Sequence, residues 1–487
     1  MWNHVINLIL VAALSRLTFS LHSDAGPWIR STKGEVWPMP NSRMIKEDFY
    51  LLRPSNFDFR VNGETCDIVN EAIERYTRII LTEARIARLV TEGQPRTSVR
   101  EDPHFKGTLE ALNIRFLQPC EQNGEHWPHL YMNESYKLEV NETSSIAILR
   151  AESVWGILRG LETFSQVLAP SGDGPSLKIR CQIIVDEPKL PHRGLLVDTS
   201  RHYFPLSDIL LTLDAMSYNK LNVLHWHIVD DNSFPYQSTR YPDLSTKGAY
   251  HPSMIYTPND VQKVVDYARL RGIRVMPEFD TPGHTRSWGL AYPELLTLCY
   301  DSSGKPNGKL GPMNPTNLAL YDFVRNLFSE IVQVFPDQYL HLGGDEVPFD
   351  CWGSNPEIIE YMKAHNMSRK YELLENEYIA KILSISKLLD ANTIVWQEVF
   401  DNGVVLPDST VVHVWKLQQW QKELERATLA GHPVLLSSCW YLDHMAATGG
   451  DWEKYYNCDP FDFSNAINAT HLMLGGEACM WTEFVDK

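Results

Sequence analysis

Two neighbouring carboxylates, Asp345 and Glu346, follow an apolar run and a glycine pair in the stretch YLHLGGDEV (339–347). The apolar run predicts a short buried strand, and Gly343-Gly344 permits a sharp turn where that strand ends. Adjacent side chains near a strand end point in different directions, so these two acids are not expected to share one proton. We expect them to contact different parts of one ligand. A solvated acidic turn would explain a lone Gly-Gly-Asp-Glu equally well, so the surrounding sequence has to decide.

Acidic and aromatic side chains recur where the other predicted strands end. They are Asp198 with Arg201, Asp230 with Asp231, Glu278 with Asp280 and His284, Trp396 with Glu398, Trp415, Trp440 with Tyr441 and Asp443, and Glu477 with Trp481 and Glu483. Each alone has a structural explanation: a tryptophan at a strand end is more often core than ligand contact, Arg201 could form a structural ion pair, and His284 could be a turn residue. Their recurrence is hard to explain by packing. Aromatic faces beside hydrogen-bond acceptors are typical of a sugar site.

The segments that would position these residues alternate between strands and helices. Strands are expected over 194–198, 222–229, 274–279, the start of 339–347, 393–396, 410–415, 433–437 and 471–474, with helices over 206–220, 258–271 and 318–335. This alternation predicts an α/β fold, a (β/α)₈ TIM barrel, in which chemistry lies at the C-terminal ends of the strands. Irregular loops are expected in place of helices after Trp396 and after Trp440.

A smaller α+β domain is expected before the barrel. It would span residues 21–187, with helices over 67–90 and 153–168 and a half-buried strand over 135–140. The proline-flanked segment PKLP (188–191) is the expected junction, and the barrel would occupy residues 188–487. No catalytic cluster is evident in the smaller domain, so the chemistry is expected in the barrel.

The chain carries the marks of a secretory route. Residues 1–20 are expected to be a signal peptide whose apolar core, 5–14, is too short to span a bilayer, and no other stretch approaches the length of a membrane span. The sequons at Asn133, Asn141, Asn366 and Asn468 predict glycosylation, and eight cysteines are compatible with disulfides. No Cys/His metal pattern appears, so no metal or cofactor is expected.

The overall charge excludes some classes of partner. Sixty-one acidic residues against 44 basic ones give a net charge of -17, which argues against nucleic acid or an anionic membrane as a partner. The acidic excess also suits a compartment in which a low pH neutralises part of it. We therefore expect a luminal or secreted glycoprotein.

At this point the sequence resembles the β-N-acetylhexosaminidases of glycoside hydrolase family 20, including their lysosomal members of the beta type. The matching stretches are PHRGLLVDTSRHY (191–203), LHWHIVDD (224–231), PEFDTPGH (277–284), HLGGDEV (341–347), VWQEVF (395–400) and GGEACMW (475–481). The resemblance covers nearly the whole chain, including the smaller domain. It implies retaining, substrate-assisted hydrolysis of terminal non-reducing β-linked N-acetylglucosamine and N-acetylgalactosamine, in which the substrate's own 2-acetamido oxygen attacks the anomeric carbon.

The resemblance also implies roles for the matched residues. Glu346 would protonate the departing glycosidic oxygen and later activate water. Asp345 would hold the acetamido N–H, and Tyr441 would donate to the acetamido oxygen. Further roles in substrate binding are implied for Arg201 and Glu483 on sugar hydroxyls, Asp230 and His284 in the network around Glu346, and Trp396, Trp415 and Trp481 as pocket walls.

One position bears on substrate choice. Where the family's subunit types differ, this chain has Asp443-His444. The alpha-like type carries Asn-Arg there and favours 6-sulfated or acidic sugars, whereas the beta-like type carries Asp-Leu and favours neutral ones. Asp443 would repel a sulfate, so neutral terminal sugars are expected. A protonated His444 would weaken this preference at acidic pH.

The resemblance has consequences for cysteines, assembly and location. It implies the disulfides Cys66–Cys120 and Cys299–Cys351 and an unpaired Cys479. The remaining cysteines, Cys181, Cys439 and Cys458, receive no partner. It also implies a lysosomal or secreted homo- or heterodimer that acts on glycans, glycoproteins or glycolipids.

The end of the chain departs from the family pattern. The family continues past the counterpart of Lys487 with a final helix and a disulfide-tied tail, so a product truncated after the eighth strand is expected. Such a helix would bury about four large apolar side chains at roughly 1.5–3 kcal/mol each. Whole domains are stable by only about 5–15 kcal/mol, so its loss is expected to impair folding or activity.

Two other readings remain open. A metal-dependent barrel hydrolase would use His225 and His227 on one strand face, with Asp230, Asp280 and His284 near them. An inactive sugar-binding relative would keep the pocket without the chemistry. Retained activity in a chelator would exclude the first reading, and measurable turnover would exclude the second.

Overall fold

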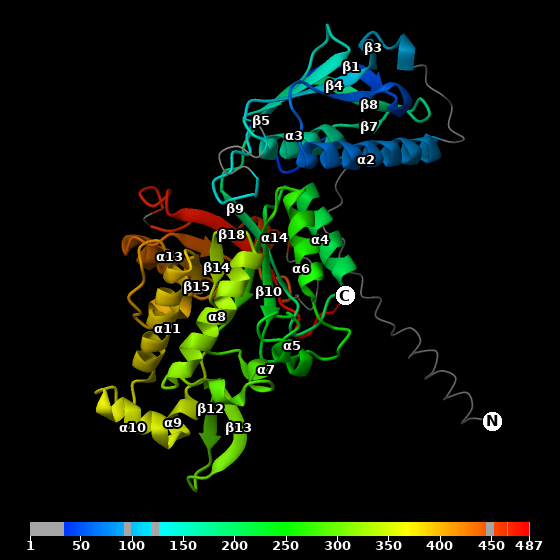
Figure 1. Cartoon of the computed structure of the whole chain (residues 1–487). Coiled ribbons are helices and arrows are strands. Elements are labelled where there is room, and N and C mark those ends of the chain that lie inside the picture. Colours follow the sequence, from blue (N-terminus) through cyan, green and yellow to red (C-terminus); the bar gives the residue numbers. More distant parts are fainter. Residues whose placement is uncertain are drawn as a thin grey trace, which may run out of the picture.

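The computed structural model describes residues 34–91, 99–118, 120, 126–444, 452–464 and 466–486, and these form two domains (Figure 1). The predicted signal peptide, residues 1–20, lies outside them. Among the described residues, no helix is long and apolar enough to cross a membrane.

The first domain is an eight-stranded sheet with two helices on one face (Figure 1). Seven strands lie in the order β2-β4-β6-β5-β8-β1-β3, and β7 pairs with β8. The strands are β1 (Ser42–Leu52), β2 (Asp58–Val61), β3 (Phe105–Leu109), β4 (Ala111–Phe116), β5 (Tyr136–Val140), β6 (Ile146–Ala151), β7 (Ala169–Pro170) and β8 (Leu177–Asp186), and the helices are α2 (Asp67–Thr91) and α3 (Val154–Gln166). Short 3₁₀ turns occupy Pro54–Asn56 and Val99–Glu101. The expected α+β architecture is confirmed.

The second domain is a closed barrel of eight parallel strands, as the alternation of strands and helices predicts. Its strands in barrel order are β9 (His192–Asp198), β10 (Val223–Val229), β11 (Arg274–Phe279), β14 (Tyr339–His341), β15 (Asn392–Trp396), β16 (Val411–Val414), β17 (Val434–Leu436) and β18 (Met473–Met480). The longer helices are α4 (Leu206–Tyr218), α6 (Pro258–Arg269), α8 (Leu318–Val334), α11 (Tyr371–Leu388) and α13 (Trp420–Leu429). Their apolar faces pack on the barrel in one continuous core.

Shorter elements gather mainly around the site. They are α5 (Asp243–Gly248), α7 (Arg286–Gly289), the 3₁₀ turn Pro293–Leu295, the hairpin β12 (Leu296–Tyr300) and β13 (Pro306–Met313), α9 (Asp350–Ser354), α10 (Pro356–Ala364), α12 (Gln397–Asp401) and α14 (Trp452–Tyr456). The β12–β13 hairpin projects at the end of the molecule away from the first domain (Figure 1). A disulfide between Cys299 and Cys351 joins β12 to α9.

The eighth strand is longer than expected. The prediction ended it at Leu474, but β18 continues through Gly475 and Gly476 to Met480. Glycines weaken a strand pattern, which hides this continuation in the sequence. Gly475 is needed because its backbone approaches β9 closely: a Cβ there would lie 1.8 Å from the His192 carbonyl oxygen. The expected irregular loops after Trp396 and Trp440 are also corrected, since they contain the short helices α12 and α14.

Two helices end earlier than their apolar patterns predict. The helix expected over 206–220 ends at Tyr218, and that expected over 258–271 ends at Arg269. In both cases a left-handed residue follows shortly, Lys220 with φ 56° and Gly272 with φ 65°. These turns direct the chain into β10 and β11.

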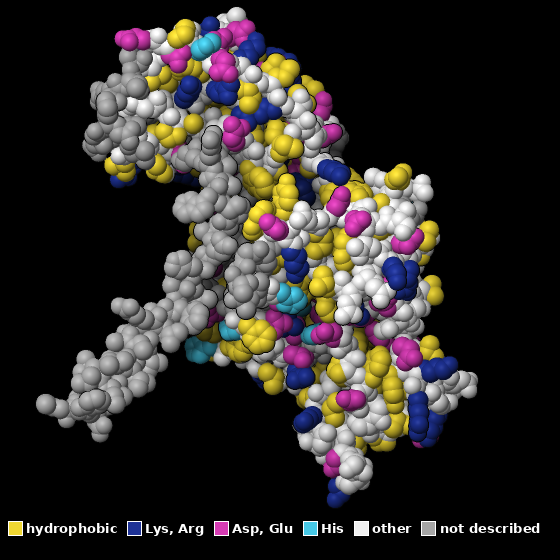
Figure 2. Space-filling model, turned by 180° about the vertical axis from the view of Figure 1, so that it is seen from behind, with side chains coloured by type: hydrophobic (Ala, Val, Ile, Leu, Met, Phe, Trp, Pro, Cys, Tyr) yellow, Lys and Arg dark blue, Asp and Glu magenta, His cyan; other side chains and the backbone are white. Residues whose placement is uncertain are grey.

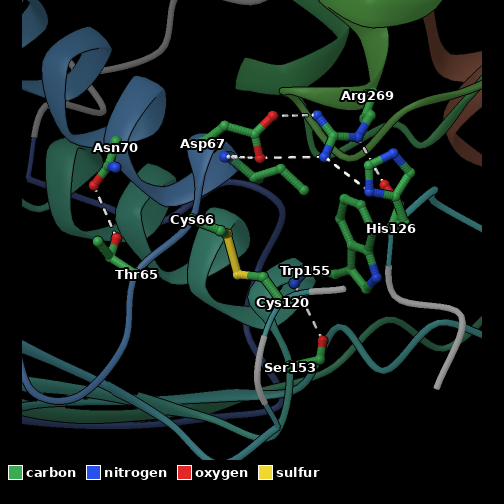
Figure 3. Close-up of a disulfide and its surroundings, with 10 residues drawn as sticks. Thr65, Cys66, Asp67, Asn70, Cys120, His126, Ser153, Trp155 and Arg269 are labelled. Atoms are coloured by element: carbon green, nitrogen blue, oxygen red, sulfur yellow. Dashed lines mark hydrogen bonds and ion pairs between the residues drawn. A yellow bond between two sulfur atoms is a disulfide. The ribbon is translucent and has the colours of Figure 1, made fainter. Parts of the chain in front are cut away.

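Polar contacts fasten the first domain to the N-terminal ends of the barrel strands. Glu134 is buried and accepts hydrogen bonds from Arg159 and Arg193, both at 2.6 Å, and from Asn222 at 3.1 Å. At the start of α2, next to the Cys66–Cys120 disulfide, Asp67 accepts from Arg269 at 2.6 Å (Figure 3). The opposite end of the barrel, where the C-terminal strand ends lie, is left clear of these contacts.

The excess of acidic residues is distributed over both domains. In the view of Figure 2, acidic and basic side chains are scattered over each domain and among apolar ones.

Candidate active site

Asp345 and Glu346 lie just past β14, where two left-handed glycines turn the chain. Gly343 has φ 71° and Gly344 has φ 94°. A Cβ on Gly343 would lie 1.7 Å from Asp280 Oδ1, so only glycine fits this approach. The two acids then face different surroundings, because the Asp345 side chain is 14% exposed and the Glu346 side chain 60% exposed.

Asp280 lies next to Asp345 and binds the turn that carries it. Its Oδ1 accepts a hydrogen bond from the Gly344 backbone N–H at 2.8 Å. Burial, and then the neighbouring Asp345 carboxylate, raise the pKa of Asp280 well above its usual value. Asp280 therefore keeps its proton and can donate it to Asp345. The Oδ1 atom of Asp345 is buried and has no hydrogen-bond partner among the described residues.

His284 joins the polar groups around the two acids. Its Nδ1 lies 3.2 Å from Asp230 Oδ1, and its Nε2 lies 3.7 Å from Asp345 Oδ2 and 4.0 Å from Glu346 Oε2. Burial alone would lower the pKa of His284, but the neighbouring carboxylates of Asp345 and Asp230 outweigh it and raise the pKa well above its usual value. A cationic imidazole thus lies beside the proposed acid.

Arg201 is held in place by acidic side chains. Its guanidinium lies 2.9 Å from Asp230 and 3.2 Å from Asp198, and 3.6 Å from Glu483. The structural ion pair considered for Arg201 therefore exists. Its side chain remains 11% exposed, at the edge of the same pocket, so the ion pairs fix a cation that still faces the site.

Aromatic side chains from four strand ends form one wall. Trp396, Tyr441 and Trp481 pack together with the partly buried Trp415. The Tyr441 ring lies 6.1 Å from Trp415 and 6.4 Å from Trp481, centroid to centroid. The structure therefore shows that these side chains pack against one another at the C-terminal ends of the strands.

Hydrogen bonds fix the orientation of two indoles in this wall. Trp396 Nε1 donates to Glu278 Oε1, and Trp415 Nε1 donates to Glu398 Oε2, both at 2.8 Å. Burial raises the pKa of Glu398, and Lys416 partly offsets this from 3.0 Å away.

The loop after β17 carries Tyr441, Asp443 and His444. A disulfide between Cys439 and Cys458 closes this loop, a pair that was not assigned from the sequence. Asp443 Oδ1 is buried and has no hydrogen-bond partner among the described residues, while Asp443 Oδ2 lies 3.7 Å from His444 Nε2. Within the described residues, Cys181 and Cys479 are free and buried.

Glu477 is placed differently from the prediction, whereas Glu278 lies near the end of β11, as expected. Glu477 was expected past a strand end but lies within β18. Both glutamates are buried in the closed barrel, where they bind histidines. The eighth strand was misjudged at its glycines, which explains the error for Glu477. A signal for such an interior was available in the charged and histidine side chains that occupy otherwise apolar strands.

Two groups of side chains have donor atoms close enough to hold a metal ion. One is His225, His341 and His413, and the other is Asp280, His284 and Asp345. The reading as a metal-dependent hydrolase grouped His225 with His227. The structure shows that these two share Glu278 instead, at 2.9 and 2.7 Å.

A cleft of about 880 Å³ opens beside Glu346. Its lining includes Asp231, His284, Arg286, Tyr300, Glu346 and Asp350. The cleft extends over the β12–β13 hairpin, away from the aromatic wall. Glu346 is therefore accessible from this cleft.

Comparisons with known proteins agree with this geometry. A family profile described as glycosyl hydrolase family 20, catalytic domain, matches residues 190–487, and a second profile, beta-acetyl hexosaminidase like, matches residues 36–167. The chain is 45% identical to beta-hexosaminidase subunit beta of Homo sapiens over 93% of this chain and 79% of that protein. It is 43% identical to beta-hexosaminidase subunit alpha of Rattus norvegicus over 99% of this chain and 87% of that protein.

A solved structure supports the same assignment. The chitobiase of Flavobacterium johnsoniae superposes with a TM-score of 0.74 at 26% identity, over 94% of this chain and 67% of that one. The two profiles together span both domains, and the identity to the curated relatives extends over most of their length. The chain therefore belongs to glycosyl hydrolase family 20 and is a β-N-acetylhexosaminidase by descent and fold.

Proposed function

We propose that this protein removes terminal non-reducing β-linked N-acetylglucosamine and N-acetylgalactosamine from glycoconjugates with retention of configuration, through Asp345 and Glu346. The observation that carries the proposal is the contrast between these two neighbours. Asp345 offers a buried acceptor that has no partner among the described residues, whereas Glu346 is exposed to a cleft. The first suits an N–H on the substrate, and the second suits a proton that is exchanged with solvent.

In the first step, the C1–O bond to the leaving group breaks while the substrate's acetamido oxygen bonds to C1. Glu346 gives its proton to the departing oxygen, so the leaving group departs as an alcohol. Asp345 accepts the acetamido N–H and offsets the positive charge that develops on the amide. The Tyr441 hydroxyl donates to the acetamido oxygen.

In the second step, water adds to C1 from the side that the leaving group vacated. Glu346, now ionised, removes a proton from that water, and the bond between C1 and the acetamido oxygen breaks. Two displacements at C1 restore the original configuration. Glu346 regains its proton, so the cycle closes without a further reactant.

The other predicted residues supply binding contacts in this proposal. Arg201 and Glu483 contact sugar hydroxyls, and the buried Oδ1 of Asp443 accepts from another. Trp396, Trp415 and Trp481 stack against the apolar faces of the sugar and its acetamido methyl group. Asp230 and His284 hold the polar side of the pocket.

The cellular setting follows from the same relatives. We infer a lysosomal or secreted glycoprotein, which acts on glycans, glycoproteins or glycolipids as a homo- or heterodimer. Curated relatives are named as alpha and beta subunits, which supports assembly into dimers. The asparagines of all four sequons, Asn133, Asn141, Asn366 and Asn468, are exposed, so each is accessible to glycosylation.

The test is turnover of β-N-acetylglucosaminide and β-N-acetylgalactosaminide substrates between about pH 4 and 7, the range in which carboxyl and imidazole groups titrate. Turnover of both sugars is expected, with no turnover of the matching β-glucoside, which lacks the acetamido group. Glu346→Gln should lower kcat by roughly 10²–10⁴-fold on a substrate with a poor leaving group. Asp350→Asn, an exposed carboxylate of the same cleft, is the matched control and should keep wild-type turnover. Near-normal turnover by Glu346→Gln would overturn the proposal.

A further inference from the structure

Near the end of β11, the Glu278 carboxylate lies inside the barrel and is close to four side chains from other strands. It is fully buried. Its Oε1 accepts from Trp396 Nε1 at 2.8 Å and lies 3.2 Å from His341 Nδ1. Its Oε2 lies 2.7 Å from His227 Nδ1 and 2.9 Å from His225 Nε2.

The contact with His227 continues to the polar side of the pocket. His227 Nε2 lies 2.8 Å from Asp230 Oδ2. Asp230 in turn holds Arg201 at 2.9 Å and His284 at 3.2 Å. One interior carboxylate therefore reaches both the aromatic wall and the groups around Glu346.

We propose that Glu278 is a positioning residue for the reaction: one oxygen sets the Trp396 indole, and the other, through His227, sets the polar groups that face the sugar. Glu278 itself does not reach the substrate. This inference rests on the proposed function, because it assigns Trp396 and Asp230 to the substrate pocket.

The charges along this chain alternate. Burial would raise the pKa of Glu278, but its histidine neighbours outweigh burial and lower it well below the usual value. Burial would lower the pKa of His227, but Glu278 and Asp230 raise it well above the usual value. Hydrogen bonds from His227 and His284 likewise outweigh burial and lower the pKa of Asp230. The result is a carboxylate, an imidazolium and a second carboxylate in a row.

Other titratable groups also face Glu278. They are His225 on β10, His341 on β14, Asp280 after β11 and Cys479 on β18. Burial would lower the pKa of His225, but Glu477 and Glu278 raise it to about 9. Burial lowers the pKa of His341 and raises those of Asp280 and Cys479, so these three stay neutral. His225 is thus the second cation on Glu278, beside His227.

Glu477 provides a matched comparison. It is equally buried in the same barrel and also binds two histidines, His192 at 2.6 Å and His225 at 2.7 Å. Neither of these two histidines is assigned to the substrate pocket. A purely structural role for interior carboxylates would make the two residues equivalent, whereas a positioning role belongs to Glu278 alone.

The experiment compares Glu278→Gln with Glu477→Gln in the full chain. Glutamine keeps the shape of Glu278 but removes the charge, so the pKa of His227 falls and Asp230 loses the cation that keeps its own pKa low. The pKa of Asp230 therefore rises, and the acidic limb of the kcat/KM profile should move to higher pH in Glu278→Gln. Its kcat should fall by about 10²-fold, the scale of a small misplacement of catalytic groups.

Glu477→Gln should lose a similar amount of thermal stability, keep kcat close to wild type, and leave the acidic limb in place. Equal losses of kcat in the two variants, or an acidic limb that does not move in Glu278→Gln, would overturn the proposal. If Glu278→Gln does not fold, His227→Gln replaces it in the experiment. The acidic limb of its kcat/KM profile should move to higher pH in the same way, and an unchanged profile would contradict the proposal.

The same comparison can be made without turnover. Calorimetric binding of N-acetylglucosamine as a function of pH should show the same shift for Glu278→Gln and no shift for Glu477→Gln. A wild-type protein that binds the sugar but lacks turnover would contradict the proposed function alone. Wild-type turnover with unshifted variants would contradict only the role of Glu278.

Discussion

Asp345 and Glu346 are neighbours in the chain, yet their backbones and side chains are held differently. Glu346 has a left-handed backbone with φ 48°, which costs a non-glycine residue about 1–3 kcal/mol. Such a conformation persists only where the surrounding structure enforces it. Here it turns the Glu346 side chain toward the cleft while Asp345 stays packed against Asp280.

Under the proposed function, Asp443 and His444 bear on the choice between neutral and sulfated sugars. Asp443 should repel a sulfate at the sugar's 6-position, so plain N-acetylglucosaminides should be hydrolysed faster than 6-sulfated ones, and Asp443→Asn should narrow the difference. Parallel kcat/KM measurements on both substrates check this. His444→Leu is the control for the neighbouring imidazole. A wild-type preference for the sulfated substrate would contradict the assignment.

The two histidine- and acid-rich groups raise the question of a metal. Within the first, His225 is bound by Glu278 and Glu477, and within the second, Asp280 supports Asp345. The proposed mechanism needs no metal at either group. Activity should therefore survive exhaustive dialysis against a chelator. Loss of activity that added Zn²⁺ restores would favour the metal-dependent reading instead.

Most residues of the proposed site could be assigned from the sequence because their neighbours in the chain form recognisable stretches. The sequence did not predict the partners that lie far apart in the chain. Glu278 contacts His227 and Trp396 only when the barrel closes. No local sequence pattern predicts which residues of the other strands will contact it. Asp280 was considered only as a possible metal ligand. Its raised pKa depends on burial beside Asp345, which the sequence does not reveal.

At the scale of elements, the strands could be predicted because eight apolar runs alternate with amphipathic helices. The full length of β18 could not be predicted, because Gly475 and Gly476 interrupt its apolar pattern. The close approach of Gly475 to β9 nevertheless requires a glycine there. The Cys439–Cys458 pair also escaped prediction, since cysteine spacing does not determine connectivity. Both misjudged features lie next to the pocket.

The loop closed by Cys439–Cys458 positions Tyr441 and Asp443. Two more contacts tie it down: Trp440 Nε1 donates to the Tyr455 carbonyl at 3.0 Å, and Tyr455 donates to the Tyr441 carbonyl at 3.1 Å. The double variant Cys439→Ser/Cys458→Ser should therefore raise KM severalfold. Steady-state kinetics on an N-acetylglucosaminide check this.

The control is Cys66→Ser/Cys120→Ser, which removes a disulfide from the first domain, far from the pocket. It should lower the melting temperature, since loss of a native disulfide typically costs about 2–5 kcal/mol, and leave KM unchanged. An unchanged KM in the Cys439/Cys458 variant would contradict the role of its loop.

At the scale of the whole molecule, both domains contain buried acids whose titration sets the pH range of stability. Burial raises the pKa of Glu162 to about 7 and that of Glu375 to about 8. A raised pKa in the folded state stabilises the fold below the unfolded value, and this contribution is lost as pH rises through 7 and 8. His225, with its pKa raised to about 9, acts in the same direction.

Other acids set the lower limit. Basic neighbours outweigh burial and lower the pKa values of Glu134, Glu278 and Glu477, so their contribution is present above the unfolded value and is lost as pH falls. The melting temperature should therefore be highest near pH 5 to 6, roughly between the two groups of pKa values. Melting curves across pH check this.

Glu162→Gln should flatten the decline of the melting temperature above pH 6, about the point where this carboxyl begins to ionise, because the glutamine does not titrate. An exposed carboxyl of the same domain, Glu64→Gln, is the control and should leave the curve unchanged. A melting temperature that rises steadily to pH 8, roughly the pKa of Glu375, would contradict the assignment of these buried acids.

The central claim is that the two neighbouring acids act on different atoms of one sugar. The most direct measurement compares Asp345→Asn and Glu346→Gln on N-acetylglucosaminides whose leaving groups differ in pKa. The loss of kcat in Glu346→Gln should grow as the leaving group becomes more basic, because such groups depend on its proton. The loss in Asp345→Asn should be similar for all leaving groups, because Asp345 acts on the acetamido group. The same dependence on leaving group in both variants, or none in Glu346→Gln, would contradict the account.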